Sequence, residues 1–205
     1  MGLTIPVILN SVNNLSDARY AAGMGVDLMG FEVEEGVERY VNPDLFKAIT
    51  AWLSGVQTVT SVSVLNSSTL AFIQEHYQPD FIQFESVEGI SQSDLSEIAC
   101  IQKISIPLGR ELDVLAQIKQ QMYDEANFIL LDLSDWSDWK NNKEIISQVN
   151  THHTILWALP IEKEDVEFIH SLDLKGIALK GGDEQRPGWK DLDELIDILE
   201  ALEEN

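Results

Sequence analysis

The sequence predicts an α/β protein with eight strand–helix units, which is the pattern of a closed (β/α)₈ barrel, the TIM barrel. Short apolar runs alternate with amphipathic segments from one end of the chain to the other. Such alternation implies a parallel sheet covered by helices. The 205 residues suffice for eight units in one domain, expected over residues 1–205. A doubly wound open sheet is the alternative.

The strands are expected where short apolar runs stand between turn residues. These runs are residues 5–10, 27–33, 56–65, 80–84, 101–108, 127–132, 154–158 and 176–179. The helices are expected between them, at residues 15–24, 43–53, 67–76, 91–99, 111–123, 141–149, 163–172 and 191–202. Asn13 or Asn14 suits the cap of the first helix. Asn42 precedes Pro43, which suits the first position of the second helix.

The composition limits the classes of function. The formal net charge of −22 argues against binding to nucleic acid or to an anionic membrane surface. The single cysteine, Cys100, allows neither an internal disulfide nor a thiolate metal cluster. No His or acidic spacing suggests a metal site, and no cofactor is expected. The chain does not start with a basic segment followed by a long apolar run, so a cytoplasmic protein is expected.

Polar residues stand at the ends of several predicted strands. In a (β/α)₈ barrel the active site lies at the carboxyl ends of the strands. Asn10, Glu32, Gln83 and Asp132 are therefore expected around one mouth, together with the loop that begins at Lys180.

That loop suggests a phosphate site. Gly181 and Gly182 follow the last strand, and a glycine pair allows a backbone to approach a ligand and direct amide groups at it. Lys180, Arg186 and Lys190 add positive charge to a chain that is otherwise negative. The alternative is that the glycine pair only forms a turn and Lys180 pairs with a carboxylate.

Four stretches of the sequence resemble the phosphoribosylanthranilate isomerase family of tryptophan biosynthesis. They are NLSDA at residues 14–18 with its continuation to residue 27, RYVNP at 39–43, FILLD at 128–132 and PGWKD at 187–191. The resemblance implies an Amadori rearrangement of a small phosphorylated aminosugar. It places the general acid at Asp132, provided that burial raises its pKa, and ligand-binding residues at Arg39 and Gln83. A monomer or a homodimer is expected.

Other positions depart from the family pattern. The family's catalytic base is a cysteine in a Lys-x-Cys-Gly setting, and these positions are Ile8, Asn10 and Ser11 here. An amide cannot act as a base near neutral pH. Leu159 and Pro160 replace a glycine pair of the phosphate site. We therefore expect altered or lost isomerase activity. The alternative is a noncatalytic barrel that binds a phosphorylated metabolite or a partner protein.

Two further groups of residues have less specific interpretations. Glu32, Glu34 and Glu85 follow strands and are possible substitutes for the missing base, although 35 acidic residues make such neighbours common. Trp136 and Trp139 are expected to pack in the core rather than to cover the mouth.

Overall fold

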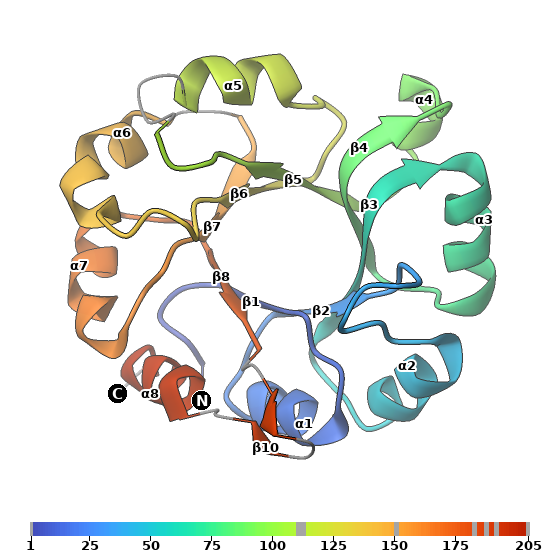
Figure 1. Ribbon diagram of the computed structural model, residues 1–205, viewed down its shortest axis with the longest axis horizontal. Helices are drawn as coiled ribbons and strands as arrows, with labels where there is room; N and C mark the ends of the chain where they lie inside the picture. The colour runs from blue at the N-terminus through green and yellow to red at the C-terminus, as the bar shows by residue number, and fades with distance from the viewer. Residues whose placement is uncertain are drawn as a thin grey trace.

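Eight parallel strands close into a barrel, as the sequence predicts (Figure 1). The computed structural model describes residues 2–109, 114–149, 152–181, 184–186, 189–190 and 193–203. Each strand pairs in parallel with the next, and β8 pairs with β1 to complete the ring. The strands are β1 (Val7–Asn10), β2 (Leu28–Glu32), β3 (Gln57–Asn66), β4 (Phe81–Glu88), β5 (Cys100–Ser105), β6 (Phe128–Asp132), β7 (Thr154–Ala158) and β8 (Ile177–Lys180).

Helices surround the barrel, and their first turns use the caps that the sequence suggests. Asn14 Oδ1 accepts from the Asp17 amide at 3.0 Å, and Asn42 Oδ1 accepts from the Leu45 amide at 2.9 Å. These bonds satisfy amides that have no partner within the helix. The helices are α1 (Leu15–Gly23), α2 (Pro43–Thr50), α3 (Ser67–His76), α4 (Gln92–Leu95), α5 (Val114–Gln121), α6 (Lys143–Gln148), α7 (Val166–Ser171) and α8 (Asp193–Ala201).

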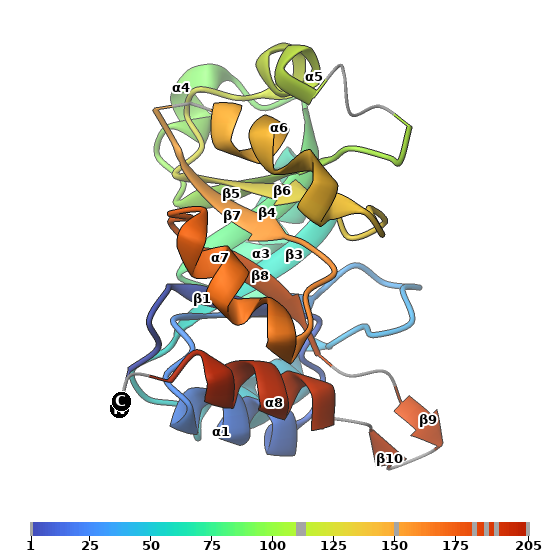
Figure 2. The ribbon, with the colours of Figure 1, turned by 90° about the vertical axis from the view of Figure 1, so that its left-hand side faces the viewer.

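The structure differs from the sequence prediction at several boundaries. The fourth helix is a single turn, Gln92–Leu95, and short 3₁₀ helices precede α6 and α7 at Trp139–Asn142 and Lys163–Asp165. The loop expected after the eighth strand contains a small antiparallel pair, β9 (Glu184–Arg186) and β10 (Trp189–Lys190), which extends away from the barrel (Figure 2). The start expected for the fifth helix, residues 111–113, lies outside the described residues.

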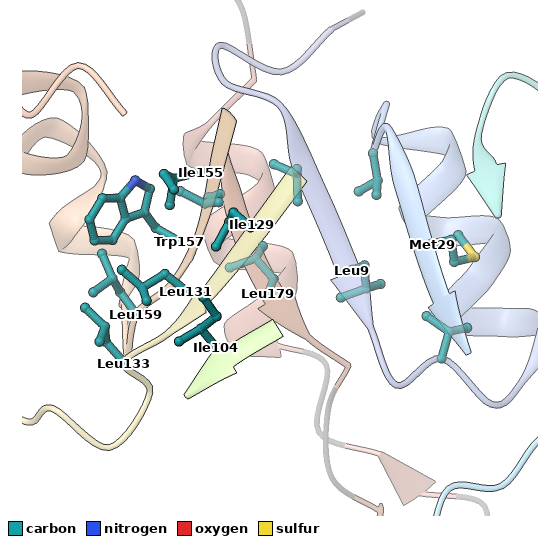
Figure 3. Packing of buried hydrophobic residues seen from close by; sticks show 14 of the residues in the cluster. Leu9, Met29, Ile104, Ile129, Leu131, Leu133, Ile155, Trp157, Leu159 and Leu179 are labelled. Atoms are coloured by element: carbon teal, nitrogen blue, oxygen red, sulfur yellow. The ribbon is translucent and has the colours of Figure 1, made fainter. Parts of the chain in front are cut away.

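The main core lies between the barrel and its helices (Figure 3). Alternate strand residues such as Leu9, Met29 and Leu131 point outward and are fully buried there. Trp136 and Trp139 belong to the same core, which confirms their predicted packing role. The indole nitrogen of Trp136 donates to the Ile106 carbonyl at 2.9 Å, and that of Trp139 donates to the Pro160 carbonyl at 3.2 Å. Both buried N–H groups therefore have a hydrogen-bond partner.

A second, smaller core fills the inside of the barrel. It takes one residue from each of seven strands: Ile8, Leu28, Val59, Ile101, Leu130, Leu156 and Ala178. Phe81 of β4 packs beside them, with its ring 5.5 Å from that of Phe128. Since side chains alternate along a strand, the residue two positions further on also points inward. In most strands this residue is polar, and it faces the carboxyl end of the barrel.

The two ends of the chain meet at the opposite end of the barrel. The Thr4 amide donates to the Leu202 carbonyl at 2.8 Å, and Leu3 pairs with Glu203. The thiol of Cys100, at the start of β5, is buried, and burial raises its pKa to about 11, which fits a small apolar side chain. Within the described residues, no helix is both long and apolar enough to span a bilayer.

Candidate ligand-binding site at the barrel mouth

A cavity of about 620 Å³ opens at the carboxyl ends of the strands. Asn10, Glu32, Gln83 and Asp132 all line it, which confirms the predicted placement of these four residues at one mouth. Arg39 and Lys180 line it as well. The cavity has a polar side formed by β1, β2, β4, β5 and β6 and an apolar side formed by the end of β7, the segment after it and α8. The apolar side comprises Ala158, Leu159, Pro160, Ile161, Leu195 and Ile198.

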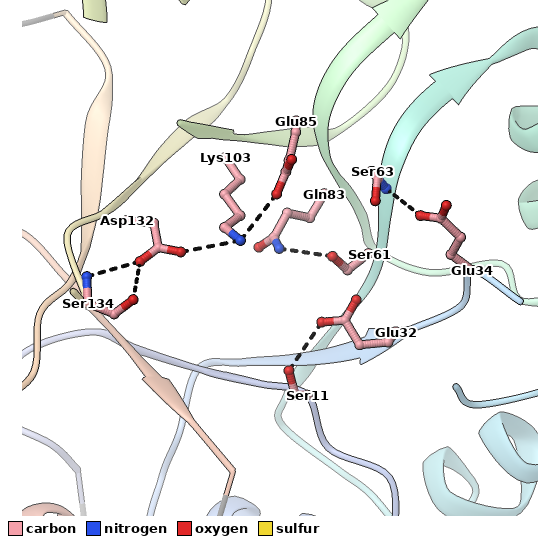
Figure 4. Close-up of polar contacts among 10 residues, drawn as sticks. All are labelled: Ser11, Glu32, Glu34, Ser61, Ser63, Gln83, Glu85, Lys103, Asp132 and Ser134. Atoms are coloured by element: carbon pink, nitrogen blue, oxygen red, sulfur yellow. Dashed lines mark hydrogen bonds and ion pairs between the residues drawn. The ribbon is translucent and has the colours of Figure 1, made fainter. Parts of the chain in front are cut away.

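Lys103 of β5 links the carboxylates of the polar side (Figure 4). Its ammonium lies 3.2 Å from Asp132 Oδ2 and 3.2 Å from Glu85 Oε1. The sequence prediction missed Lys103. The pattern that could have indicated it is a lysine inside the apolar run of β5. Lys103 stands two positions after the inward-facing Ile101, so the strand directs its side chain into the barrel.

Asp132 is held as an anion by its neighbours. Burial acts to raise the pKa of this carboxyl, but the hydrogen bonds from the Ser134 hydroxyl (2.7 Å) and amide (3.1 Å) and the ion pair with Lys103 outweigh burial. The pKa is therefore lowered from its ordinary value. The role of Asp132 as a general acid required burial to raise its pKa. That prediction of a raised pKa is wrong. Burial also acts to lower the pKa of Lys103, but Asp132 and Glu85 outweigh it and raise that pKa.

Asn10 fills the space above a glycine of the neighbouring strand. A Cβ built on Gly30 of β2 would overlap the Asn10 Oδ1 atom. This oxygen is buried and has no hydrogen-bond donor among the described residues. The lysine position of the family motif, Ile8, lies in the apolar core inside the barrel, so this position supplies no cation beneath Asn10. Position 10 therefore presents an amide to the mouth, and an amide is no base near neutral pH.

We expect Gly30→Ala to lower the free energy of unfolding by about 1 kcal/mol, because the added methyl group turns the Asn10 amide toward the cavity and lies only 3.3 Å from the Asn10 Cα atom. Chemical denaturation would measure the effect. Gly23→Ala is the matched control, since a Cβ there meets nothing within 4 Å. Combining Gly30→Ala with Asn10→Ala should recover most of the loss. Strictly additive effects of the two substitutions would contradict this packing.

Ser11, which stands where the family motif has glycine, has a backbone conformation that favours glycine. Its φ of 60° lies in the left-handed region, which is strained for a residue with a side chain. Its hydroxyl donates to Glu32 Oε1 at 3.1 Å. Of the three possible substitute bases, Glu34 accepts from the Ser63 amide at 2.8 Å and Glu85 pairs with Lys103. Glu32 is the one of these three that lines the main cavity.

The Gly181 amide is not directed at a ligand, so this part of the predicted phosphate site is wrong. The amide donates to the Asn10 carbonyl at 2.9 Å, because the β8–β1 ladder continues through this residue. The Gly181 carbonyl accepts from Arg39 Nη1 at 2.8 Å, and the same nitrogen donates to the Ser11 carbonyl at 3.3 Å. Arg39 thus fastens the loop after β1 to the loop after β8. Gly182 lies outside the described residues.

Among the residues that the structure describes, the rest of the predicted phosphate corner has few donors. Leu159 and Pro160 form an apolar surface there, and proline has no amide hydrogen. Glu194, in the first turn of α8, also lines the cavity. Its negative charge would repel an anion that approached the start of this helix. Lys180 is exposed at the mouth. The described residues hold no group of three His, Cys, Asp or Glu side chains suited to a metal ion.

No family model and no curated protein matches the sequence. Solved structures match the fold. Phosphoribosylanthranilate isomerase from Thermotoga maritima is 19% identical with a TM-score of 0.70, and the enzyme from Pyrococcus furiosus is 15% identical with a TM-score of 0.74. Each match covers 97% of this chain and 98% of the other. A 3-hexulose-6-phosphate synthase is 9% identical, with a TM-score of 0.61 over 97% of this chain and 100% of that one. The chain therefore has the closed-barrel fold of the phosphoribosylanthranilate isomerases along nearly its whole length.

Proposed function

We propose that this protein is a diverged barrel of the phosphoribosylanthranilate isomerase type that binds a small phosphorylated sugar at its mouth and has lost the isomerase reaction. The observation that carries the proposal is the state of the two catalytic positions. Asn10 cannot accept a proton near neutral pH, and Asp132 is held as an anion by Ser134 and Lys103. An Amadori rearrangement needs a base to remove one proton and an acid to deliver another.

Ligand binding is supported by what remains at the mouth. The cavity of about 620 Å³ is within the range of small-molecule sites. It combines an apolar side with convergent polar groups, among them Arg39 and Gln83, for which we propose ligand contacts. A noncatalytic binding protein is favoured over an enzyme with altered chemistry, because Asn10 cannot act as the base and Asp132 has no proton to give as the acid. A partner protein as the ligand has no comparable support, since the polar groups converge inside a concave site.

The phosphate of such a ligand is proposed to bind at Lys180. The lysine acts as a point charge, because the Gly181 amide is engaged in the barrel ladder and Pro160 has no amide hydrogen. In the described part of the corner no free backbone amide supplements this ammonium, and an ammonium alone gives weak binding that salt screens readily. The overall charge of −22 weakens it further by repelling an anion.

We expect ribose 5-phosphate to bind the wild type in the millimolar range at low salt, and Lys180→Ala to weaken this binding by about tenfold or more. Isothermal titration at two salt concentrations would measure both effects. Lys175→Ala is the matched control, because Lys175 precedes the same strand at the opposite end and its ion pair with Asp173 is highly exposed. Equal affinities of the wild type and Lys180→Ala, or no binding by either, would contradict the proposed phosphate site.

The oligomeric state is proposed to be a monomer or a homodimer. One similar structure is described as monomers generated from a dimeric phosphoribosylanthranilate isomerase of Thermotoga maritima, 20% identical to this chain with a TM-score of 0.70. Both states therefore occur on this fold.

A further inference from the structure

The side of the mouth opposite Lys180 has a separate set of polar groups around Gln83. Lys180 ends β8, whereas Gln83 belongs to β4, and in a closed ring of eight strands these two lie on opposite sides. A second cavity of about 70 Å³ adjoins the main one on the Gln83 side. The two cavities share Glu32, Gln83 and Lys103.

Gln83 has hydrogen-bonding capacity that the protein does not use. The side chain is only 3% exposed, and its Nε2 donates to Ser61 Oγ at 3.0 Å. Its Oε1 is buried without a donor from the described part of the chain, and the same holds for Asn10 Oδ1. A buried acceptor that lacks a donor carries an uncompensated desolvation cost, which a ligand donor at the same place would recover.

The charges around Gln83 favour the same kind of ligand. Three carboxylates, those of Glu32, Glu85 and Asp132, stand on this side, and one ammonium, that of Lys103, is shared between two of them (Figure 4). Glu32 accepts one hydrogen bond, from Ser11, and keeps a second oxygen for a ligand. Such a surface attracts hydroxyl or ammonium donors and repels a carboxylate.

We propose that Gln83, Glu32 and Asn10 form a subsite that binds the hydrogen-bond-donating end of the ligand, either sugar hydroxyls or a protonated amine. The inference rests on the proposed function in that the same mouth binds the ligand, but it does not require the phosphate contact at Lys180. It assigns the selectivity of the site to the β1–β5 side. The apolar surface at Leu159 and Ile161 is then free to pack against carbon atoms of the ligand.

The test compares three sugars of similar size: glucosamine, glucose and glucuronate. We expect the wild type to bind at least one of the first two and to bind glucuronate at least tenfold more weakly. Gln83→Met, which keeps the length of the side chain but removes its amide, should weaken the binding of the preferred sugar tenfold or more. Glu32→Gln should weaken glucosamine far more than glucose, which distinguishes an ammonium from a hydroxyl ligand. Circular dichroism and thermal unfolding of each variant would verify its fold.

Several results would overturn the subsite. These are equal affinity for the three sugars, absence of binding by both glucose and glucosamine, or unchanged affinity in Gln83→Met. If Gln83→Met does not fold, Glu32→Gln decides, and unchanged affinity for both glucose and glucosamine overturns the proposal. Binding of ribose 5-phosphate that depends on Lys180 but not on Gln83 would retain the proposed function while rejecting this subsite. Sugar binding that depends on Gln83 and is not strengthened by a phosphate group would retain this subsite while rejecting the proposed binding of a phosphorylated sugar.

Discussion

The purified protein should turn over phosphoribosylanthranilate far more slowly than an active isomerase of the same fold. A positioned general base alone contributes about 10²- to 10⁴-fold to a rate, and Asn10 supplies none. The lowered pKa of Asp132 removes a second contribution, because a carboxylate that is already ionised at neutral pH has no proton to give. We therefore expect kcat/KM to be at least about 10³-fold below that of the Thermotoga maritima enzyme assayed in parallel.

Variants at position 10 separate the missing base from failure to bind. Asn10→Cys restores a group with an accessible thiolate, whereas Asn10→Ser has a similar size and no useful base. A gain in kcat for Asn10→Cys over Asn10→Ser would show that the substrate still binds in a productive position. Turnover by the wild type at a rate ordinary for an isomerase would refute the loss of catalysis.

Lys103→Met should lower the free energy of unfolding at neutral pH by about 1–3 kcal/mol, since it leaves two carboxylates without their shared cation. Asp132 and Lys103 are 21% and 28% exposed, so the pair lies between a surface and a buried ion pair. Because the folded pKa of Asp132 is lowered, its stabilising contribution is present above the ordinary carboxyl pKa and disappears as the pH falls below it. The difference between wild type and variant should therefore shrink below about pH 4.

The same reasoning applies at high pH with the opposite sign. The folded pKa of Lys103 is raised, so its contribution is complete below the ordinary lysine pKa and is lost as the pH rises through the folded value. Denaturant unfolding at a series of pH values would measure both limbs. Lys163→Met is the control, because Lys163 and Asp197 are 3.1 Å apart, close to the 3.2 Å of Lys103 and Asp132, but about half exposed, and such pairs contribute about 0–1 kcal/mol. An equal loss in the two variants would contradict the structural role of Lys103.

The location of the site followed from local patterns in the sequence. Apolar runs of strand length alternate with helical segments, and side chains alternate in direction along each strand, so Asn10, Gln83 and Asp132 had to meet at one end of a parallel barrel. The caps at Asn14 and Asn42 were also readable, because capping depends on neighbours within one turn. The absence of a base at position 10 could be predicted from the identity of its side chain alone.

The chemical state of the site was decided by the tertiary structure. The pKa of Asp132 depends on Lys103 from another strand, and the availability of the Gly181 amide depends on its pairing with Asn10 at the other end of the chain. Likewise, Asn10 is positioned by the space that Gly30 leaves on β2. Local patterns in a sequence indicate which side chains reach a mouth, because that depends on the period of each strand. They do not indicate which groups meet there, because burial and charge pairing arise between segments that only the closed barrel brings together.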